Sequence, residues 1–391
     1  MAQMIEVLGE APPLGRHAQA RFYQPELDGL RFYAFLGVFI CHSLPNEAPF
    51  YRGLHIPMPW LWAGVVRSGG AGVDLFFALS AFLITSLVLK ERQETGKISL
   101  RLFYIRRILR IWPLYFLVVA LGILLAHTMS NHSISWFYEQ SLPSYYVAGY
   151  LLFVSNWVYA VFGAAQSICA PLWTVSIEEQ FYLIWPALMK VSNRRGMIVA
   201  AMITFMLAMG SQAGVVLTGG NPGFIVFGSA SRCESLALGV LLALCSHRLP
   251  RPMTRGRFLL VASGLAGWII SSCWLSDRSG PANMPMVLGH MIVSLGAGAI
   301  LYGCLQSHGR IFTGDWVVRL GKVSYGLYML HFTGLLLVAT AIRPVGRLEL
   351  LASKALGFVM TLILAFASYR WIESPFLRLK ERFSTVLSRP V

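Results

Sequence analysis

The sequence predicts an all-α integral membrane protein with about ten transmembrane helices and one re-entrant or partial segment. Of its 391 residues, 56% are hydrophobic and only 13% are charged, whereas a soluble domain carries roughly 25% charged residues. The apolar residues also gather in long runs, as helices that span a bilayer require. The apolar stretches lie near residues 30–45, 70–89, 108–126, 146–163, 172–189, 196–217, 225–246, 257–275, 284–305, 323–342 and 355–373.

The charges of the loops predict which end of each stretch faces the cytoplasm, because cytoplasmic loops carry an excess of Lys and Arg. The net charge of +15 therefore favours basic cytoplasmic loops, and we expect no nucleic-acid partner. Arg16 and Arg21 place the N-terminus inside, and the strongly basic loop at 90–110 is inside as well. The loop at 127–146 has no Lys or Arg and is outside, and the basic loop at 190–196 is again inside.

The stretches at 146–163 and 172–189 lie between an outside loop and an inside loop, so together they cross the membrane an odd number of times. One of them therefore does not span, and the sequence leaves open which one. The second is short and contains two carboxylates, which makes it a candidate re-entrant segment or one part of a broken crossing.

The remaining loops mostly alternate, with the loop at 343–354 as the exception, so we expect ten crossings and two cytoplasmic termini. This gives a cytoplasmic tail at 1–25, a membrane domain at 26–378 and a second cytoplasmic tail at 379–391. The first 25 residues contain no apolar stretch of the signal-peptide kind. The six cysteines show no metal-ligand spacing, so we expect packing residues, with neither a disulfide framework nor a metal site.

Ionisable side chains within a span cost at least about 2.5 kcal/mol each and usually face a cavity or a partner. They therefore mark candidate functional positions. Here they are His42, Asp74, Glu178, Glu179, Arg232, Glu234 and His331.

The first candidate site pairs His42 with Asp74. His42 lies eleven residues after Arg31, or about 16 Å along a helix, so Arg31 lies near the cytoplasmic face and His42 in the outer half. The next stretch starts outside, which places Asp74 at a similar depth. A carboxylate that holds one imidazole nitrogen raises the basicity of the other, as a general base requires. The alternative is that His42 is a polar contact between helices.

The second candidate site is basic. Arg106 and Arg110 are four residues apart and share one helix face, with Arg107 beside them. Guanidinium groups suit phosphate oxygens, so the cluster predicts a phosphate-bearing ligand at the cytoplasmic side. The alternative is anchoring of the loop at the membrane surface under the positive-inside rule.

Two further candidate site residues are the acidic Glu178 and the basic His331. Glu178 lies in "WTVSIEEQFYLIWP", where we expect it to be buried. His331 follows a cytoplasmic basic loop, so we expect it to lie nearer the cytoplasm than His42. A structural hydrogen bond is its expected role, and a competing general base is the alternative.

Besides Arg31 and His42, several stretches follow in order along residues 25 to 378, namely "GVDLFFALSAFLI", "YIRRILRIWPLY", "WTVSIEEQFYLIWP", "SRCESLALGVLLA", "LGKVSYGLYMLH" and "YRWIESPF". Together they resemble the signatures of membrane acyltransferase family 3, the O-acyltransferases of bacterial surface glycans. Arg31 and His42 match the Arg-x10-His pattern of that family. Ala81, Thr174 and Glu234 replace its usual glycine, serine and aspartate.

The resemblance implies transfer of an acyl group, by default acetyl, from cytoplasmic acyl-CoA to a hydroxyl of a cell-surface or exported carbohydrate or glycolipid. It implies no bound cofactor, contact with the lipids of the bacterial inner membrane, and the stand-alone form without an added hydrolase-like domain. Arg31, Arg106, Arg107 and Arg110 would bind acyl-CoA.

The expected catalytic residues are His42 as general base, Asp74 as its orienting carboxylate, and Glu178 as a group that orients the acceptor or relays the proton. A direct attack on the thioester by the acceptor hydroxyl is expected. Cys41 adjoins His42 in the sequence, but neighbours in a helix point about 100° apart, so we expect Cys41 to be a packing residue and not a nucleophile. The expected supporting residues are Trp173, Ser176, Tyr182, Arg232, Glu234 and His331.

Two other classes of function remain open. A transporter or flippase of a glycan or lipid-linked precursor also has many spans and buried charges, but it often shows paired interrupted segments, and none is evident in the sequence. A sensor or binding protein would need no base beside a thioester site. Consumption of acyl-CoA that depends on His42 distinguishes the enzyme from both.

Overall fold

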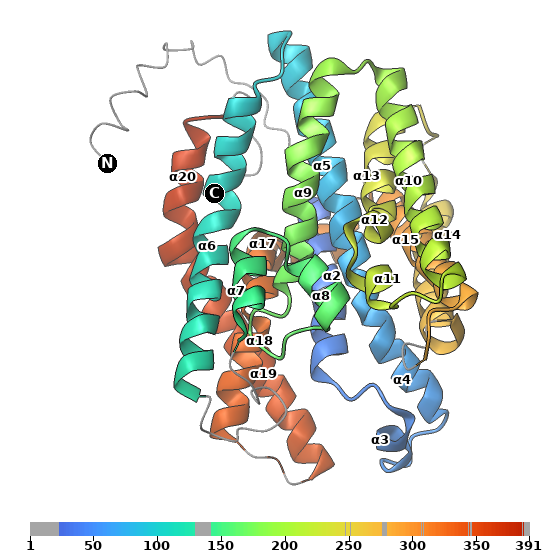
Figure 1. Cartoon of the computed structure of the whole chain (residues 1–391), viewed down its shortest axis with the longest axis vertical. Coiled ribbons are helices and arrows are strands. Elements are labelled where there is room, and N and C mark those ends of the chain that lie inside the picture. The colour runs from blue at the N-terminus through green and yellow to red at the C-terminus, as the bar shows by residue number, and fades with distance from the viewer. Residues whose placement is uncertain are drawn as a thin grey trace.

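The computed structural model describes residues 23–129, 142–246, 248–250, 252–275, 280–305, 307, 309–342, 344, 346–384 and 386, and these residues form an all-helical bundle (Figure 1). The predicted fold class is thereby confirmed. Most of the predicted N-terminal tail, and much of the predicted C-terminal one, lie outside the described residues.

Seven helical segments within the described residues are long and apolar enough to cross a membrane. The first is Pro59–Thr95, in which α4 (Pro59–Ser68), η1 (Gly69–Ala71) and α5 (Gly72–Thr95) form one rod. The others are α6 (Leu100–Met129), α10 (Arg194–Leu217), α14 (Thr254–Ile270) with η2 (Ser271–Leu275), α15 (Met284–Cys304), α18 (Ser324–Ala341), and α19 (Arg347–Ser368) with η3 (Tyr369–Glu373) and α20 (Ser374–Glu381). The count of about ten crossings stays a prediction.

Two further helices have the length of a span but carry charged residues. They are α2 (Pro25–Ser43), with 19 residues, and α9 (Leu172–Val191), with 20. Helix α2 packs against α5, α17 (Asp315–Lys322) and α18, and α9 packs against α5 and α6. The approach of α17 is close, because a Cβ atom at Gly321 would lie 1.9 Å from the carbonyl oxygen of Asp28. The remaining short helices in this part are α3 (Ala48–Arg52) and α16 (Arg310–Thr313).

The stretch before α9 is the interrupted one, and the acid-bearing stretch is a continuous helix. Which of the two crosses the membrane stays open. Residues 172–191 form a single helix, whereas the preceding stretch breaks into α7 (Ser144–Leu151) and α8 (Ser155–Phe162) (Figure 1). At the break, Phe153 has the left-handed φ of 55°. The backbone carbonyls that the break leaves without a helical partner accept hydrogen bonds from side chains. Tyr115 donates to Tyr150 O at 2.8 Å, and Gln180 donates to Phe153 O at 2.8 Å.

A second interruption divides the stretch at 223–245 into α11 (Gly223–Phe227), α12 (Ser229–Arg232) and α13 (Glu234–Cys245). The sequence did not indicate paired interruptions, but α8 and α11 pack against one another. Asn156 on α8 donates to Phe227 O at 3.0 Å and to Ser229 Oγ at 2.8 Å. Gln180 on α9 bonds to Asn156 Oδ1 and accepts from Ser229, so one amide joins the two breaks.

Candidate active site

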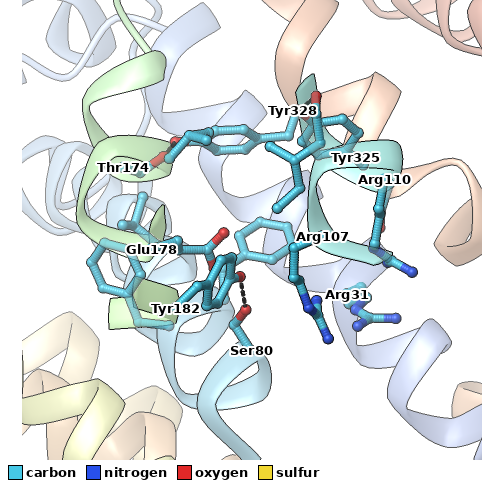
Figure 2. A pocket seen from close by; sticks show the side chains of 15 residues that line it. Arg31, Ser80, Arg107, Arg110, Thr174, Glu178, Tyr182, Tyr325 and Tyr328 are labelled. Carbon is cyan, nitrogen blue, oxygen red and sulfur yellow. Dashed lines mark hydrogen bonds between the residues drawn. The ribbon is translucent and has the colours of Figure 1, made fainter. Parts of the chain in front are cut away.

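A pocket opens between five helices, α2, α5, α6, α9 and α18. It holds about 740 Å³ of space free of protein atoms, including the part that opens outward. Its polar lining comes from segments far apart in the sequence, which Figure 2 shows converging on one space. These residues are Arg31, Ser80, Arg107, Arg110, Thr174, Glu178, Tyr182, Ser324, Tyr325 and Tyr328.

One side of the pocket is basic. Arg107 and Arg110 are three residues apart on α6, so both face the pocket, and Arg31 reaches it from α2 (Figure 2). Arg107 lies over the ring of Tyr182 at 5.3 Å from its centroid, and Arg31 Nη1 is 3.0 Å from Asp28 Oδ1. The stacking and the ion pair hold the guanidinium groups in position.

The opposite side of the pocket is formed by α9. Glu178 and Tyr182 are four residues apart and project into the same space, and Tyr182 Oη lies 2.5 Å from Ser80 Oγ (Figure 2). The structure thus brings Glu178 and Tyr182 together with three of the four arginines named from the sequence. Ser80 and Tyr328 line the pocket as well, although neither was named as a site residue. Their only sequence signal was their place within the quoted stretches.

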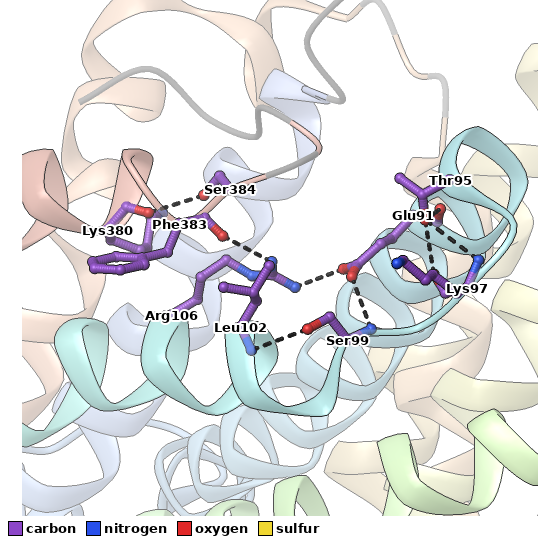
Figure 3. Close-up of polar contacts among 9 residues, drawn as sticks. All are labelled: Glu91, Thr95, Lys97, Ser99, Leu102, Arg106, Lys380, Phe383 and Ser384. Carbon is purple, nitrogen blue, oxygen red and sulfur yellow. Dashed lines mark hydrogen bonds and ion pairs between the residues drawn. The ribbon is translucent and has the colours of Figure 1, made fainter. Parts of the chain in front are cut away.

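Arg106 does not line this pocket. Its Nη2 atom lies 2.6 Å from Glu91 Oε2 on α5, and its Nη1 atom donates to Phe383 O at 3.0 Å (Figure 3). It therefore joins α5 and α6 to the chain after α20. The reason is rotational, because neighbouring residues of a helix point about 100° apart and Arg106 cannot follow Arg107.

A second, smaller pocket adjoins the first. Arg106, Arg107 and Arg110 line it together with Glu91 and Lys380. The predicted shared face of Arg106 and Arg110 is found here. Since Arg107 and Arg110 line both pockets, their guanidinium groups stand between the two spaces.

His42 and His331 meet away from the arginines. His42 is half-buried near the end of α2, and its Nδ1 atom lies 2.9 Å from Nε2 of the fully buried His331. His331 Nδ1 lies 2.6 Å from the carbonyl oxygen of Tyr328, a residue that lines the first pocket. The expectation that His331 lies nearer the cytoplasm than His42 is wrong, because a direct contact puts the two rings at the same depth.

The expected pairing of Asp74 with His42 is also wrong. A Cβ atom at Gly37 would lie 3.2 Å from Gly69 O, and one at Gly72 would lie 2.3 Å from Ala34 O, so the two helices run antiparallel in close contact. His42 and Asp74 lie five residues beyond this contact in opposite directions, about 15 Å apart along the axis. The physical reason is that the spanning helix begins at Pro59, well before residue 70.

Asp74 instead belongs to a buried polar cluster. Its Oδ2 atom lies 2.9 Å from Arg232 Nη2, and its Oδ1 accepts from Ser235 at 3.0 Å. Arg232 Nη1 also lies 2.6 Å from His290 Nδ1 and 3.8 Å from Glu234 Oε1. The cluster thus unites the predicted Asp74, Arg232 and Glu234, and it joins α5, α12, α13 and α15 rather than supporting the imidazole of His42.

Two predicted supporting residues hold α9 against the interrupted segments. Ser176 Oγ lies 2.8 Å from Ser155 Oγ at the start of α8. The ring of Trp173 meets Phe227 of α11 edge-on, with centroids 5.1 Å apart. Both side chains therefore position the helix that carries Glu178, and neither lines the pocket.

Comparisons with known proteins give the chain its family. An acyltransferase domain family matches residues 24–370. The chain is 29% identical over 386 residues to "Putative peptidoglycan O-acetyltransferase YrhL" of Bacillus subtilis, with 90% of this chain and 55% of the relative covered. It is 26% identical over 382 residues to the peptidoglycan O-acetyltransferase OatA of Listeria monocytogenes, with 91% of this chain and 56% of the relative covered.

The chain thus spans a little over half the length of these curated relatives. No solved structure matches it. The family match covers most of the chain and includes every residue that lines the first pocket. The chain therefore belongs to the family of acyltransferase domains.

Proposed function

We propose that this protein is a membrane O-acyltransferase that moves an acyl group, by default acetyl, from acyl-CoA to a hydroxyl of a carbohydrate. The observation that carries the proposal is the pocket in which Arg31, Arg107 and Arg110 face Glu178 and Tyr182, with Tyr328 linking its wall to the histidine pair. Acyl-CoA carries its phosphates and its thioester at opposite ends of an extended arm. Such a donor suits a protein whose guanidinium groups and imidazoles are also separated, as Arg31 and His42 are by about 16 Å along α2.

The donor phosphates would bind the arginines shared by the two pockets. Guanidinium groups make paired, charge-assisted hydrogen bonds to phosphate oxygens. Arg107 and Arg110 face both spaces, and Lys380 adds a further cation to the smaller one. Arg106 contributes through the position of α6, because its guanidinium group is already bound to Glu91.

The reaction would use His42 as general base. Its imidazole accepts the proton of the acceptor hydroxyl as that oxygen attacks the thioester carbon. The C–S bond then breaks, and the departing thiolate recovers the proton from His42. Glu178 would orient the acceptor hydroxyl or relay its proton, since its side chain projects into the pocket.

The acceptor class follows from the relatives. Two of them carry peptidoglycan in their names, so a bacterial cell-wall or other surface glycan, or a glycolipid, is the proposed acceptor. Such a glycan is exported from the cytoplasm, whereas acyl-CoA stays in it. An enzyme that spans the membrane can contact the donor on one side and the hydroxyl of the glycan on the other. We therefore propose the inner membrane as the location, with both termini in the cytoplasm.

A transporter or flippase is the second candidate, and the paired interruptions of α7–α8 and α11–α13 are the observation that favours it. Side chains fill these breaks, however, because Gln180 and Asn156 occupy the carbonyls that a transported solute would use. We therefore propose an enzyme and not a transporter. Release of free CoA thiol from acyl-CoA by the purified protein distinguishes the two functions.

The test is mass spectrometry of surface glycans from a deletion strain restored with wild-type protein, His42→Ala or His127→Ala. His127 is an exposed histidine at the end of α6 and serves as the matched control. An acyl mass that is present with wild type and His127→Ala, and absent with His42→Ala, supports the proposal and identifies the acceptor. Wild-type acylation with His42→Ala, at equal protein levels in the membrane, contradicts the role of His42.

A further inference from the structure

We propose that His331 is a positioning residue that fixes the tautomer of His42, so that Nε2 is the unprotonated nitrogen of His42. This inference rests on the proposed role of His42 as the base. It assigns each ring nitrogen of His42 and His331 as a hydrogen-bond donor or acceptor. It also predicts which nitrogen of His42 faces the substrate.

The geometry of the two rings supports a specific hydrogen bond. His42 Nδ1 and His331 Nε2 are 2.9 Å apart, whereas the ring centroids are 5.2 Å apart and the planes differ by only 8°. The nitrogens are much closer than the ring centres, so the rings meet edge to edge. This is the arrangement in which one N–H points at the lone pair of the other ring.

The donor and acceptor roles follow from the far side of His331. Its Nδ1 atom lies 2.6 Å from the carbonyl oxygen of Tyr328, and a carbonyl oxygen only accepts. His331 therefore carries its proton on Nδ1. A neutral imidazole has one donor and one acceptor, so Nε2 of His331 accepts. The hydrogen atom between the rings then belongs to Nδ1 of His42, and Nε2 of His42 is left as the basic nitrogen.

The surroundings of His331 favour its neutral form. The side chain is fully buried, and its ring contacts Phe332 at 4.5 Å, Phe35 at 6.3 Å and Phe39 at 6.5 Å between centroids. An aromatic environment of this kind disfavours a charged ring. His331 thus differs from the carboxylate that the sequence suggested for this task, because it orients the base with no charge of its own.

The consequence for the reaction concerns one proton. When His42 Nε2 accepts the hydroxyl proton, the imidazolium keeps its Nδ1 proton. This N–H continues to donate a hydrogen bond to His331 Nε2. The positive charge is thereby stabilised while the C–O bond forms and the C–S bond breaks. The thiolate then takes the proton from His42 Nε2, and the pair returns to its starting tautomers. In the opposite tautomer of His42, Nε2 would already carry a proton and could not act as base.

The first experiment compares His331→Gln with His331→Met in purified protein. The oxygen of Gln can accept from His42 Nδ1, whereas Met has similar length and lacks a comparable acceptor. We expect His331→Met to lower kcat by about 100-fold, with KM for acyl-CoA changed less than about threefold, and His331→Gln to recover at least about tenfold of that loss. Wild-type kcat in His331→Met, or a His331→Gln no better than His331→Met, would overturn the proposal.

The second experiment observes the tautomer directly and needs no activity. Protein labelled with ¹⁵N-histidine is measured by solid-state NMR in lipid, and the His42 signals are assigned from their loss in His42→Gln. Wild type is expected to show a protonated Nδ1 and an unprotonated Nε2, and His331→Met is expected to lose this preference. A protonated Nε2 in wild-type His42 rules the proposal out.

The two experiments distinguish the inference from the function on which it rests. If His42→Ala keeps full acylation while the NMR shows the expected tautomer, the proposed base is wrong and the hydrogen-bond assignment stands. If His42→Ala is inactive and the NMR shows a protonated Nε2, the requirement for His42 stands and the role of His331 is wrong.

Discussion

The guanidinium Nη2 of Arg232 lies 2.9 Å from the Oδ2 of Asp74, with both side chains almost fully buried within the helical bundle. The ion pair joins α5 to the end of α12, 158 residues apart in sequence. Because each charge would be costly to bury alone, the pair makes the packing of these helices dependent on both residues.

Removing one member of this pair is expected to destabilise the protein. Asp74→Ala removes the nearer of the two carboxylates beside the buried Arg232 and leaves Glu234 at 3.8 Å, so we expect the free energy of unfolding to fall by about 3 kcal/mol. The measurement is thermal unfolding of protein purified in detergent. Asp74→Ala combined with Arg232→Met should recover part of the loss, because no unpaired buried cation remains. An unchanged melting temperature, together with abolished kcat, would return Asp74 to a catalytic role.

The arginines of α6 are expected to divide into two kinds. Arg107→Gln and Arg110→Gln should raise KM for acyl-CoA by about tenfold each, since each removes a charge-assisted contact to phosphate. Arg106→Gln should mainly lower the melting temperature, because it breaks the 2.6 Å contact with Glu91. Initial rates against acyl-CoA concentration give the KM values.

Arg101→Gln is the matched control for these variants, since Arg101 is an exposed arginine on the same helix. It should leave both KM and the melting temperature unchanged. Equal KM effects of Arg101→Gln and Arg107→Gln would mean that the arginines act through the general surface charge, and not through the pocket.

Glu178 and its neighbour are expected to differ in effect. Glu178→Gln keeps the size of the side chain and removes its charge inside the pocket, so we expect kcat to fall by about 100-fold. Glu179→Gln is the control, because Glu179 does not line the pocket, and we expect a change in kcat of less than about threefold. Steady-state rates at saturating acyl-CoA provide the comparison, and equal losses in the two variants would argue against a specific role of Glu178.

The amide that joins the two interruptions is expected to be structural. Gln180→Leu leaves the carbonyl of Phe153 and the side chain of Asn156 without this partner, and we expect a loss of about 1–3 kcal/mol in the free energy of unfolding. Thermal unfolding measures the loss. Gln212→Leu, which removes the 2.7 Å contact with Ser231 O elsewhere in the bundle, shows how much of it is general to buried amides. Unchanged stability in Gln180→Leu would show that the breaks need no such support.

The sequence was sufficient for the fold class. Long apolar runs with few charges leave the backbone no way to satisfy its hydrogen bonds in lipid except within helices, so an all-helical bundle follows from composition alone. The spacing of Arg106 and Arg110 likewise predicted their shared face, which lines the smaller pocket, but it did not indicate that Arg107 joins Arg110 in the larger one. The family could be recognised because its short stretches occur in order along the chain.

The partners of the ionisable residues depended on the tertiary structure. His42 contacts a residue 289 positions away, and Asp74 contacts one 158 positions away. The prediction that the two lie at similar depths was wrong, because the helix carrying Asp74 begins at Pro59 and the close approach of Gly37 to Gly69 sets its register against α2.

The sequence by itself thus determined that the chain is a bundle of membrane helices, and it named the ionisable residues whose contacts had to be found. The tertiary structure decided which of these residues meet, and also that α7 and α8, rather than α9, form the interrupted segment. The physical reason is that helical periodicity fixes the face and the rise of a residue within its own helix. The offset between two helices depends instead on how their side chains and glycines pack, and this is a property of both surfaces together.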